Sequence, residues 1–431
     1  MSKMRHEEVF PRENTFQFEF TKYMWEQGWL DEFSEEHFLI KAIKNTLSDF
    51  KYIDYYRNNN SSFSIPGIDY DSIHDMNMFN DTFVTNFSFR LKTLHELFGE
   101  SKIKKFVKDQ LSAGKSKYDE NKFFQAVSEV SILVFLSSSV LVTKSLYEPV
   151  AGEKNLGNSK KNPEASFECA WSWTIDENDN EIPTKIYKLN VEVKTPMFHS
   201  SKNLMLCVPG VLLTQDGIQK LKAYCETVGI TYRNPGIGKL VDFIKSAISK
   251  FNYPQENELN ILYINWSQSD FPSNGYLEAW SLLTNPYNGL LTNQYVMTHF
   301  GINKKELEKI SAIIVYTEDL EGFMFSDFRY TWKTEHKCGV RFRSWVRDEN
   351  QRVDNGLFFH LTHMNPTSFE YIPALVSIGK SDKIENDNDK AKICNEIQKI
   401  IEDNKFCGCI IEKKIKRIIK VLLKFFKHGN F

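Results

Sequence analysis

An acidic and basic motif, Glu192-Val193-Lys194, ends an alternating run of apolar and polar residues that begins at Lys185. Such alternation is typical of a β-strand, in which successive side chains point to opposite faces. We therefore expect Glu192 and Lys194 on one face and Val193 in the core. Charges beside an apolar core lower stability unless they pair or bind a metal. The motif thus indicates either an ion pair or a metal site.

Two further acids are predicted to reach the same place. Glu164 precedes a strand expected from Phe167 to Trp173, and Glu129 lies on the preceding, largely buried helix. Carboxylates gathered at one point bind hard divalent cations such as magnesium, with manganese as an alternative. A cation there polarises a phosphodiester and lowers the pKa of a bound water, while a lysine orients that water and offsets charge on the phosphate. The pattern predicts metal-dependent phosphodiester hydrolysis.

Pro163-Glu164 and Glu192-Val193-Lys194 resemble the Pro-Asp and Glu-x-Lys motifs of the PD-(D/E)XK nuclease superfamily, whose members share the restriction-endonuclease-like fold. The resemblance covers roughly residues 119–316. It implies that Glu164 and Glu192 are metal ligands and that Lys194 positions the nucleophilic water. It also implies that Glu129 is an auxiliary metal ligand within the catalytic group.

The chain departs from the family pattern at the first acid, which is Glu164 in place of the usual Asp. The longer side chain shifts the expected position of the metal. Glu168 would share a face with Glu164 if the strand begins early enough, and it is the alternative first ligand. The Asn-Pro dipeptide before Glu164 matches the family and favours Glu164.

Simpler explanations compete with the catalytic one. Glu-x-Lys tripeptides arise by chance, and Glu335-His336-Lys337 is another in this chain. Glu192 and Lys194 would then form an exposed ion pair on an edge strand, and Glu129 would pair with a nearby lysine. The context is more specific than the tripeptide, because the motif ends an apolar strand, follows a strand with an acid at its start and precedes Thr195-Pro196.

The fold class follows from the order of the expected elements. A helical run from Gly238 to Phe251 alternates with buried strands expected at residues 260–266 and 310–316, which indicates an α/β sheet with at least one parallel pair. We expect a restriction-endonuclease-like core with a central mixed sheet flanked by helices. The expected domains are a helical N-terminal accessory region (1–115), the nuclease-like core (116–330) and a C-terminal accessory region (331–431).

The charge balance bears on nucleic-acid binding. Lys and Arg total 54 against 56 Asp and Glu, which excludes a uniformly basic surface but leaves room for a local basic face. We predict nucleic-acid contacts from Lys250, which stands where family members often carry Lys or Gln, and from Arg341, Arg343 and Arg347. A polar face of a strand pair explains the arginines almost as well. The basic amphipathic helix expected at residues 410–431 is predicted to dock on the protein, or else to contact DNA or an anionic membrane.

The seven cysteines lack the paired Cys-x-x-Cys spacing of a structural zinc site. Free thiols in a reducing compartment are therefore expected. The chain begins with charged residues that do not resemble a signal peptide, and it contains no run of about 20 apolar residues that could span a bilayer. We expect a cytoplasmic protein without a membrane span.

The residues and the resemblance together predict a magnesium-dependent endodeoxyribonuclease of microbial defence against phage or foreign DNA. DNA is the expected substrate and RNA the alternative. Because two sites are needed to cut both strands, a homodimer or a partner protein of a defence system is expected. The competing hypothesis is a catalytically inactive nucleic-acid-binding or assembly module of a multi-protein complex.

Overall fold

The computed structural model describes residues 19–43, 70–115, 117–139, 141–149, 162–175, 181–196, 204–209, 215–232, 237–266, 275–285, 289–316, 343–346, 375–381 and 387–404. The chain divides into two compact units, each built from separate stretches of sequence. Unit 1 contains residues 1–197, 250–267 and 310–366, and unit 2 contains residues 198–249, 268–309 and 367–431.

The centre of unit 1 is a six-stranded sheet with the order β1-β2-β3-β6-β7-β8. Its strands are β1 (Leu141–Tyr147), β2 (Ala165–Ile175), β3 (Glu181–Lys194), β6 (Glu258–Asn265), β7 (Ala312–Tyr316) and β8 (Arg343–Val346). The β3, β6 and β7 strands run parallel, while β1–β2, β2–β3 and β7–β8 are antiparallel pairs. The sheet is therefore mixed, and β3 lies in its interior.

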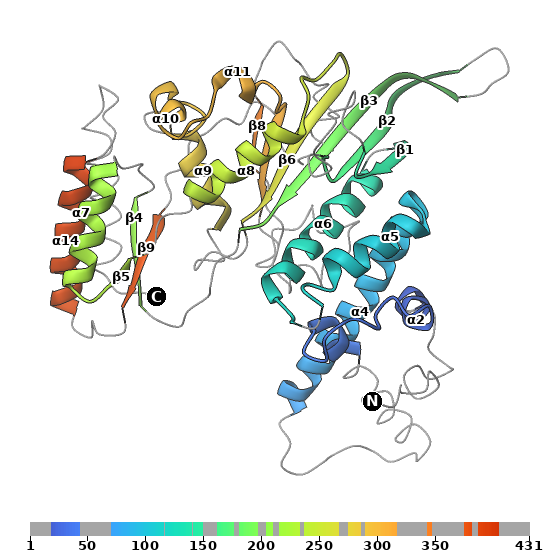
Figure 1. Ribbon diagram of the computed structural model, residues 1–431, viewed down its shortest axis with the longest axis horizontal. Helices are drawn as coiled ribbons and strands as arrows, with labels where there is room; N and C mark the ends of the chain where they lie inside the picture. The colour runs from blue at the N-terminus through green and yellow to red at the C-terminus, as the bar shows by residue number, and fades with distance from the viewer. Residues whose placement is uncertain are drawn as a thin grey trace. The chain divides into compact units, whose positions relative to one another are not determined.

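Helices from the N-terminal part of the chain pack beside this sheet (Figure 1). They are α2 (Glu19–Glu26), α4 (Tyr70–Phe98), α5 (Glu100–Phe106), the π-helical turn η1 (Val107–Leu111) and α6 (Glu120–Ser139). Of these, α6 contacts both β1 and β3, and α4 contacts β1. The α6 helix is thus the element best placed to bring a side chain to the ends of these strands.

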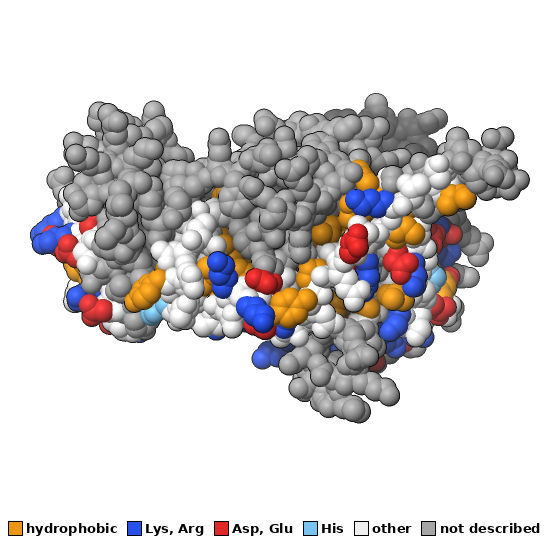
Figure 2. All heavy atoms as spheres, turned by 90° about the horizontal axis from the view of Figure 1, so that it is seen from above, with side chains coloured by type: hydrophobic (Ala, Val, Ile, Leu, Met, Phe, Trp, Pro, Cys, Tyr) orange, Lys and Arg blue, Asp and Glu red, His pale blue; other side chains and the backbone are white. Residues whose placement is uncertain are grey.

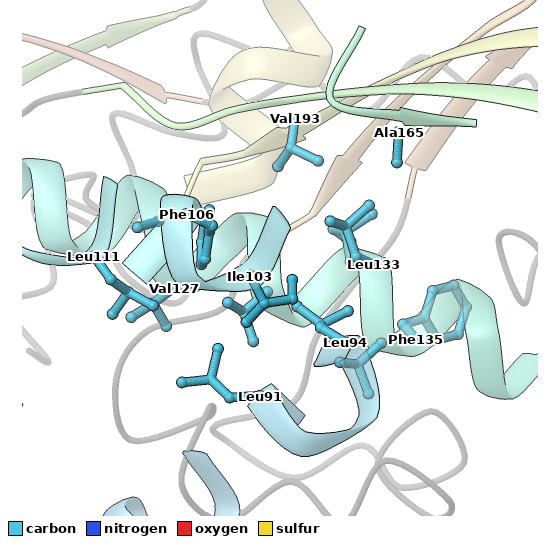
Figure 3. Close-up of a cluster of buried hydrophobic side chains, with 14 of the residues drawn as sticks. Leu91, Leu94, Ile103, Phe106, Leu111, Val127, Leu133, Phe135, Ala165 and Val193 are labelled. Carbon is cyan, nitrogen blue, oxygen red and sulfur yellow. The ribbon is translucent and has the colours of Figure 1, made fainter. Parts of the chain in front are cut away.

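One apolar core joins the helices to one face of the sheet. Figure 3 shows Ala165 and Val193 pointing from their strands toward side chains of α4, α5 and α6. Val191 and Val193 belong to this core, as alternation along β3 requires. The side chains of Glu192 and Lys194 consequently leave β3 on the opposite face.

The α6 helix is buried because its sequence is apolar around most of its circumference, and its polar groups are bonded. Asp119 caps its start, since Asp119 Oδ1 accepts from the backbone nitrogen of Asn121 at 3.0 Å. Ser128 Oγ donates to the carbonyl of Phe124 at 2.9 Å, a bond within the helix that lets a hydroxyl be buried. The helix can therefore lie in the core and still carry the acid Glu129.

Unit 2 has its own smaller sheet, in which β9 (Leu375–Ser381) pairs antiparallel with β4 (Leu204–Pro209) and β5 (Thr231–Tyr232). The helices α7 (Gln215–Thr227) and α14 (Asp387–Asn404) pack through a separate cluster that includes Leu221 and Ile397. Its other helices are α8 (Ile237–Lys250), α9 (Gly275–Thr284), α10 (Gln294–His299) and α11 (Lys304–Leu307). Lys250, the last residue of α8, is counted with unit 1.

The α/β class, the mixed sheet and its parallel pairing are confirmed. The expected buried helix is α6, and the strands expected around Phe167, Val191, Ile261 and Ile314 are β2, β3, β6 and β7. That the core has the restriction-endonuclease-like fold stays a prediction. The amphipathic helix expected at 410–431 lies outside the described residues.

Candidate active site

Glu164 lies directly beside Glu192 although it stands one residue before β2. Its backbone nitrogen donates to the carbonyl of Val191 at 2.9 Å, and its carbonyl accepts from the backbone nitrogen of Glu148 at 2.8 Å. The β2–β3 register ends where Ala165 pairs with Val191, so Glu164 stands just before this last pair and Glu192 just after it. Two like charges this close on neighbouring segments repel. The pair therefore requires cations.

Two lysine ammonium groups supply these cations. Lys194 Nζ lies 2.5 Å from Glu192 Oε1 and 3.4 Å from Glu164 Oε1. Lys250 Nζ lies 2.6 Å from Glu192 Oε1, 2.9 Å from Glu192 Oε2 and 3.3 Å from Glu164 Oε1. Each ammonium group thus contacts both carboxylates. We call Glu164, Glu192, Lys194 and Lys250 the charge cluster.

The charge cluster is almost sealed from solvent. The Glu192 side chain is 0% exposed, and those of Glu164, Lys194 and Lys250 are 18%, 22% and 15% exposed. Burying charges costs several kcal/mol for each ion, which close pairing offsets only in part. Burying these four charged groups therefore lowers the free energy of unfolding. Such clusters of buried charge are typical of functional sites.

Glu129 approaches the charge cluster from α6. Its Oε1 accepts a hydrogen bond of 2.8 Å from the hydroxyl of Tyr147, the last residue of β1. The charges of Glu164, Lys194 and Glu192 all act on Glu129. Glu129 is therefore bonded to Tyr147 and is affected by the charges of the cluster, while its convergence with Glu164 and Glu192 on one cation stays a prediction.

The environment shifts the protonation equilibria of these groups. Burial, and next the negative charge of Glu164, raise the pKa of Glu192 above its usual value. Burial and the charge of Glu164 likewise hold the pKa of Glu129 well above the ordinary range. Burial lowers the pKa of Lys194, but the charges of Glu192 and Glu164 outweigh it and raise that pKa. Lys194 is therefore a cationic hydrogen-bond donor at neutral pH rather than a base.

Glu168, the alternative first acid, is held elsewhere. Its carboxylate pairs with Lys144 Nζ at 2.9 Å, and its side chain is 39% exposed. The register also sets Glu168 opposite Lys188, whose ammonium lies 2.8 Å from Glu258. Glu168 thus belongs to an alternating ladder of charges across β1, β2, β3 and β6. Of the two acids, Glu164 is the one beside Glu192.

The competing explanation of an exposed ion pair on an edge strand does not hold. The β3 strand lies between β2 and β6, and the Glu192 side chain has no solvent exposure. Glu129 accepts its hydrogen bond from the hydroxyl of Tyr147. The charges on β3 are consequently internal to the protein.

The sequence did not predict the hydrogen bond of Tyr147 to Glu129 or the contact of Lys250 with Glu164 and Glu192. Lys250 was expected at nucleic acid, but its ammonium contacts Glu164 and Glu192. A side chain that is 15% exposed and doubly paired is less available to a phosphate than a surface lysine. Nothing in the spacing of Tyr147 marks it, because its partner lies across the sheet-to-helix interface.

The arginines predicted to contact nucleic acid have side chains outside the described residues. Arg341 and Arg347 lie outside the described residues, and Arg343 begins β8 with its side chain outside them. On the face shown in Figure 2, the described Lys, Arg, Asp and Glu side chains are interspersed rather than gathered into one basic patch. A nucleic-acid surface on this protein stays a prediction.

The residues fit a divalent cation in donor type but not in their present arrangement. Glu164, Glu192 and Glu129 offer the oxygen donors that magnesium and manganese prefer. Within the described ranges, however, no group of three or more His, Cys, Asp and Glu side chains is arranged to hold a metal. The ammonium groups of Lys194 and Lys250 contact the oxygens that a cation would use. Cation binding therefore requires both lysines to shift.

The helices in the described part of the chain are all too short or too polar to cross a membrane.

Comparison with protein-family models, curated proteins and solved structures finds no significant match to this chain.

Proposed function

We propose that this protein is a magnesium- or manganese-dependent endodeoxyribonuclease. The observation that carries the proposal is the contact of Lys194 Nζ with the carboxylates of both Glu164, just before β2, and Glu192, on β3. The PD-(D/E)XK resemblance requires two acids on adjoining strands and a lysine two residues after the second. The influence of the Glu164 and Glu192 charges on Glu129 adds support, because the family pattern implies an auxiliary acid on the preceding helix.

The chain's own residues have distinct roles in this proposal. Glu164, Glu192 and Glu129 would hold the cation, which when bound polarises the phosphodiester and lowers the pKa of the attacking water. Lys194 keeps its proton, so it orients the water by a hydrogen bond and offsets charge that develops on the phosphate. Lys250 carries a second positive charge to the same place. The cluster's buried position strengthens each of these interactions, since fewer waters screen them.

The substrate and setting are proposed from the resemblance. DNA is the expected substrate and RNA the alternative, and two copies or a partner protein would be needed to cut both strands. Microbial defence against phage or foreign DNA is the corresponding biological setting, with the protein in the cytoplasm.

One observation favours a second candidate, a catalytically inactive binding or assembly module. The two ammonium groups match the two carboxylates of Glu164 and Glu192 in number and contact both. Such a neutral cluster needs no metal for its own stability. Glu164 in place of the usual Asp is consistent with a site that has drifted from catalysis.

Metal binding and cleavage separate the two candidates. Titration of the whole chain with manganese, measured by calorimetry, should show a binding site. Glu192→Gln or Glu164→Gln should lower its affinity for manganese. Cleavage of supercoiled plasmid DNA should require magnesium or manganese, and Lys194→Ala should lower its rate by about 100-fold or more.

Glu168→Gln is the matched control, because it removes an acid four residues after Glu164, on β2, that pairs with Lys144 outside the charge cluster. It should leave manganese affinity and cleavage unchanged. Full cleavage by Lys194→Ala would refute the role given to that lysine. A chain that binds no manganese, or binds it equally after Glu192→Gln, would favour the inactive module.

A further inference from the structure

We propose that the Lys250 ammonium group stands in the place of a cation between Glu164 and Glu192, so that Lys250 and a divalent cation exclude each other. The inference concerns the site of the proposed function and rests on it in one respect, the choice of a divalent cation as the competing ion. It is carried by the contacts of Lys250 with the two acids. Lys250 is then an internal counter-ion that sets the affinity of the site for metal.

The ammonium group of Lys250 contacts three carboxylate oxygens. Its Nζ donates hydrogen bonds to Glu192 Oε2 at 2.9 Å and to Glu164 Oε1 at 3.3 Å, and it lies 2.6 Å from Glu192 Oε1. It therefore contacts both oxygens of one acid and one oxygen of the other. Acid oxygens gathered in this way are the ligands that a hard divalent cation takes. The ammonium group thus occupies the oxygens that such a cation would use.

The charge of the cluster also argues for exclusion. Glu164 and Glu192 match Lys194 and Lys250 in number, so the cluster has no net charge when all four groups are ionised. A divalent cation added to the intact cluster would leave a net positive charge where the Glu192 side chain has no solvent exposure. Uncompensated charge at such depth is strongly unfavourable. Departure of Lys250 from the cluster lowers that excess charge.

Lys194 and Lys250 are held in different ways. Lys194 is on β3, two residues after Glu192, so strand alternation keeps it beside that acid even if its side chain shifts. Lys250 is the last residue of α8 and reaches the carboxylates from another part of the chain. Its ammonium group ends a flexible four-carbon stem, and the side chain is 15% exposed. Lys250 is therefore the lysine that can leave the cluster for solvent.

The backbone that follows Lys250 is fixed to the sheet. Phe251 is 3% exposed, and the carbonyl of Asn252 accepts from Asn260 Nδ2 on β6 at 2.7 Å. Further along the same turn, the carbonyl of Asn257 accepts from the backbone nitrogen of Lys188 on β3 at 2.8 Å. Exchange of Lys250 for a cation accordingly needs a change of side-chain torsions and no rearrangement of this turn.

A structural ion pair is the competing explanation. Lys250 would then only hold the two acids together, and its removal would lower stability without raising the affinity of the site for a cation. A positive charge within about 4 to 6 Å lowers the affinity of a carboxylate for a proton by about 10- to 1000-fold. Its repulsion of a divalent cation is stronger, because the energy scales with the product of the charges. The two explanations thus differ in whether affinity rises when the Lys250 charge is removed.

The test is Lys250→Met in the full chain, with manganese affinity measured by calorimetry. We expect affinity to rise by about tenfold or more. Manganese should also raise the melting temperature of this variant more than that of the unmodified chain. Lys250→Gln is the second variant if Lys250→Met does not fold, since the amide keeps a hydrogen-bond donor without the charge.

Lys188→Met is the matched control for the loss of one positive charge. Lys188 lies on β3 as Glu192 does, but its ammonium group pairs with Glu258 at 2.8 Å, outside the charge cluster. Its removal should leave manganese affinity unchanged. In the background of Lys250→Met, Glu192→Gln should remove the gain in affinity. A gain that survives Glu192→Gln would place the ion elsewhere and overturn the inference.

The outcomes separate this inference from the proposed function. If Glu192→Gln weakens manganese binding in the unmodified chain while both Lys250 variants bind no more tightly, only the role of Lys250 is wrong. If the unmodified chain binds no manganese and Lys250→Met binds it through Glu192, the inference holds and the metal-dependent function of the unmodified chain fails. If neither the unmodified chain nor either Lys250 variant binds manganese, both fail.

Discussion

Glu192 Oε1 lies 2.5 Å from Nζ of Lys194, two residues further along β3, and the Glu192 side chain has no exposure to solvent. The two residues share a face because of strand alternation, so the pair is a local consequence of the Glu-x-Lys spacing. Lys250 then brings a second cation from a separate stretch of unit 1. The Glu192–Lys194 pair thus follows from strand alternation, whereas the contact with Lys250 depends on the tertiary fold.

The first prediction concerns the energetic coupling of this pair. Removing one partner of a buried ion pair leaves an uncompensated charge, which costs about 3 to 5 kcal/mol. We expect Lys194→Met and Glu192→Gln each to lower the unfolding free energy of the metal-free protein by about 3 kcal/mol. In a double-mutant cycle the coupling should exceed about 1 kcal/mol. Urea unfolding measures both quantities.

The exposed pair of Lys144 and Glu168 is the control for that cycle. Its side chains are 57% and 39% exposed, and exposed ion pairs contribute about 0 to 1 kcal/mol. Lys144→Met and Glu168→Gln should therefore show little coupling. Equal coupling in the two cycles would contradict the importance assigned to burial.

The second prediction is that a bound cation stabilises the protein through Glu164 and Glu192. A ligand at about 100 times its dissociation constant adds about 2.7 kcal/mol to the unfolding free energy. Magnesium or manganese should therefore raise the melting temperature of the native chain. Glu164→Gln and Glu192→Gln should abolish the increase, while Glu168→Gln should keep it. Differential scanning fluorimetry with and without cation is the measurement, and an increase that survives in Glu192→Gln would place the cation elsewhere.

Much of the site could be predicted because it depends on local rules. Alternation along β3 separates Val193 from Glu192 and Lys194, and an apolar strand with charges near its end stands out in the sequence. The expectation that Glu164 and Glu129 approach these residues follows from the order of the helix and strands and from the PD-(D/E)XK resemblance. These relationships need only the period of a strand and the order of the elements.

The remaining features depend on non-local register. Whether Glu164 or Glu168 faces Glu192 is decided by the pairing of Ala165 with Val191, and alternation alone cannot distinguish residues four apart on one strand. The position of Lys250 depends on β6 pairing with β3, across a long intervening segment. Tyr147 meets Glu129 only because α6 packs on the sheet next to β1. Each of these requires the assembled fold.

The third prediction concerns the pH dependence of metal binding. A carboxyl must lose its proton before it can bind a cation. Burial and the charge of Glu164 raise the pKa values of Glu192 and Glu129, so affinity for manganese should keep rising with pH above the ordinary carboxylate range. Calorimetry from about pH 5 to about pH 8 would show this rise. Glu129→Gln should make the dependence less steep, and an affinity independent of pH over that range would count against protonated acids in the site.

The last prediction concerns acid stability and involves His37, which is fully buried. His37 Nε2 lies 2.8 Å from the carbonyl of Leu111, and Nδ1 accepts from the backbone nitrogen of Leu39 at 3.0 Å, so the ring is a neutral tautomer. Burial lowers the pKa of His37 to about 4, although the bond to Leu111 opposes the shift.

The unfolded chain, with a histidine pKa of about 6.5, therefore binds more protons than the folded chain between these two values. The stabilisation from neutral His37 is fully present above about pH 6.5 and is lost as the pH falls toward about 4. The loss should amount to about 3 kcal/mol, and His37→Gln, which does not titrate, should remove that part of the pH dependence. Urea unfolding at about pH 7 and about pH 4.5 tests this. Between these two pH values the unfolding free energy of the native protein should fall more than that of His37→Gln. Parallel curves for the two proteins would show that His37 does not carry the acid sensitivity.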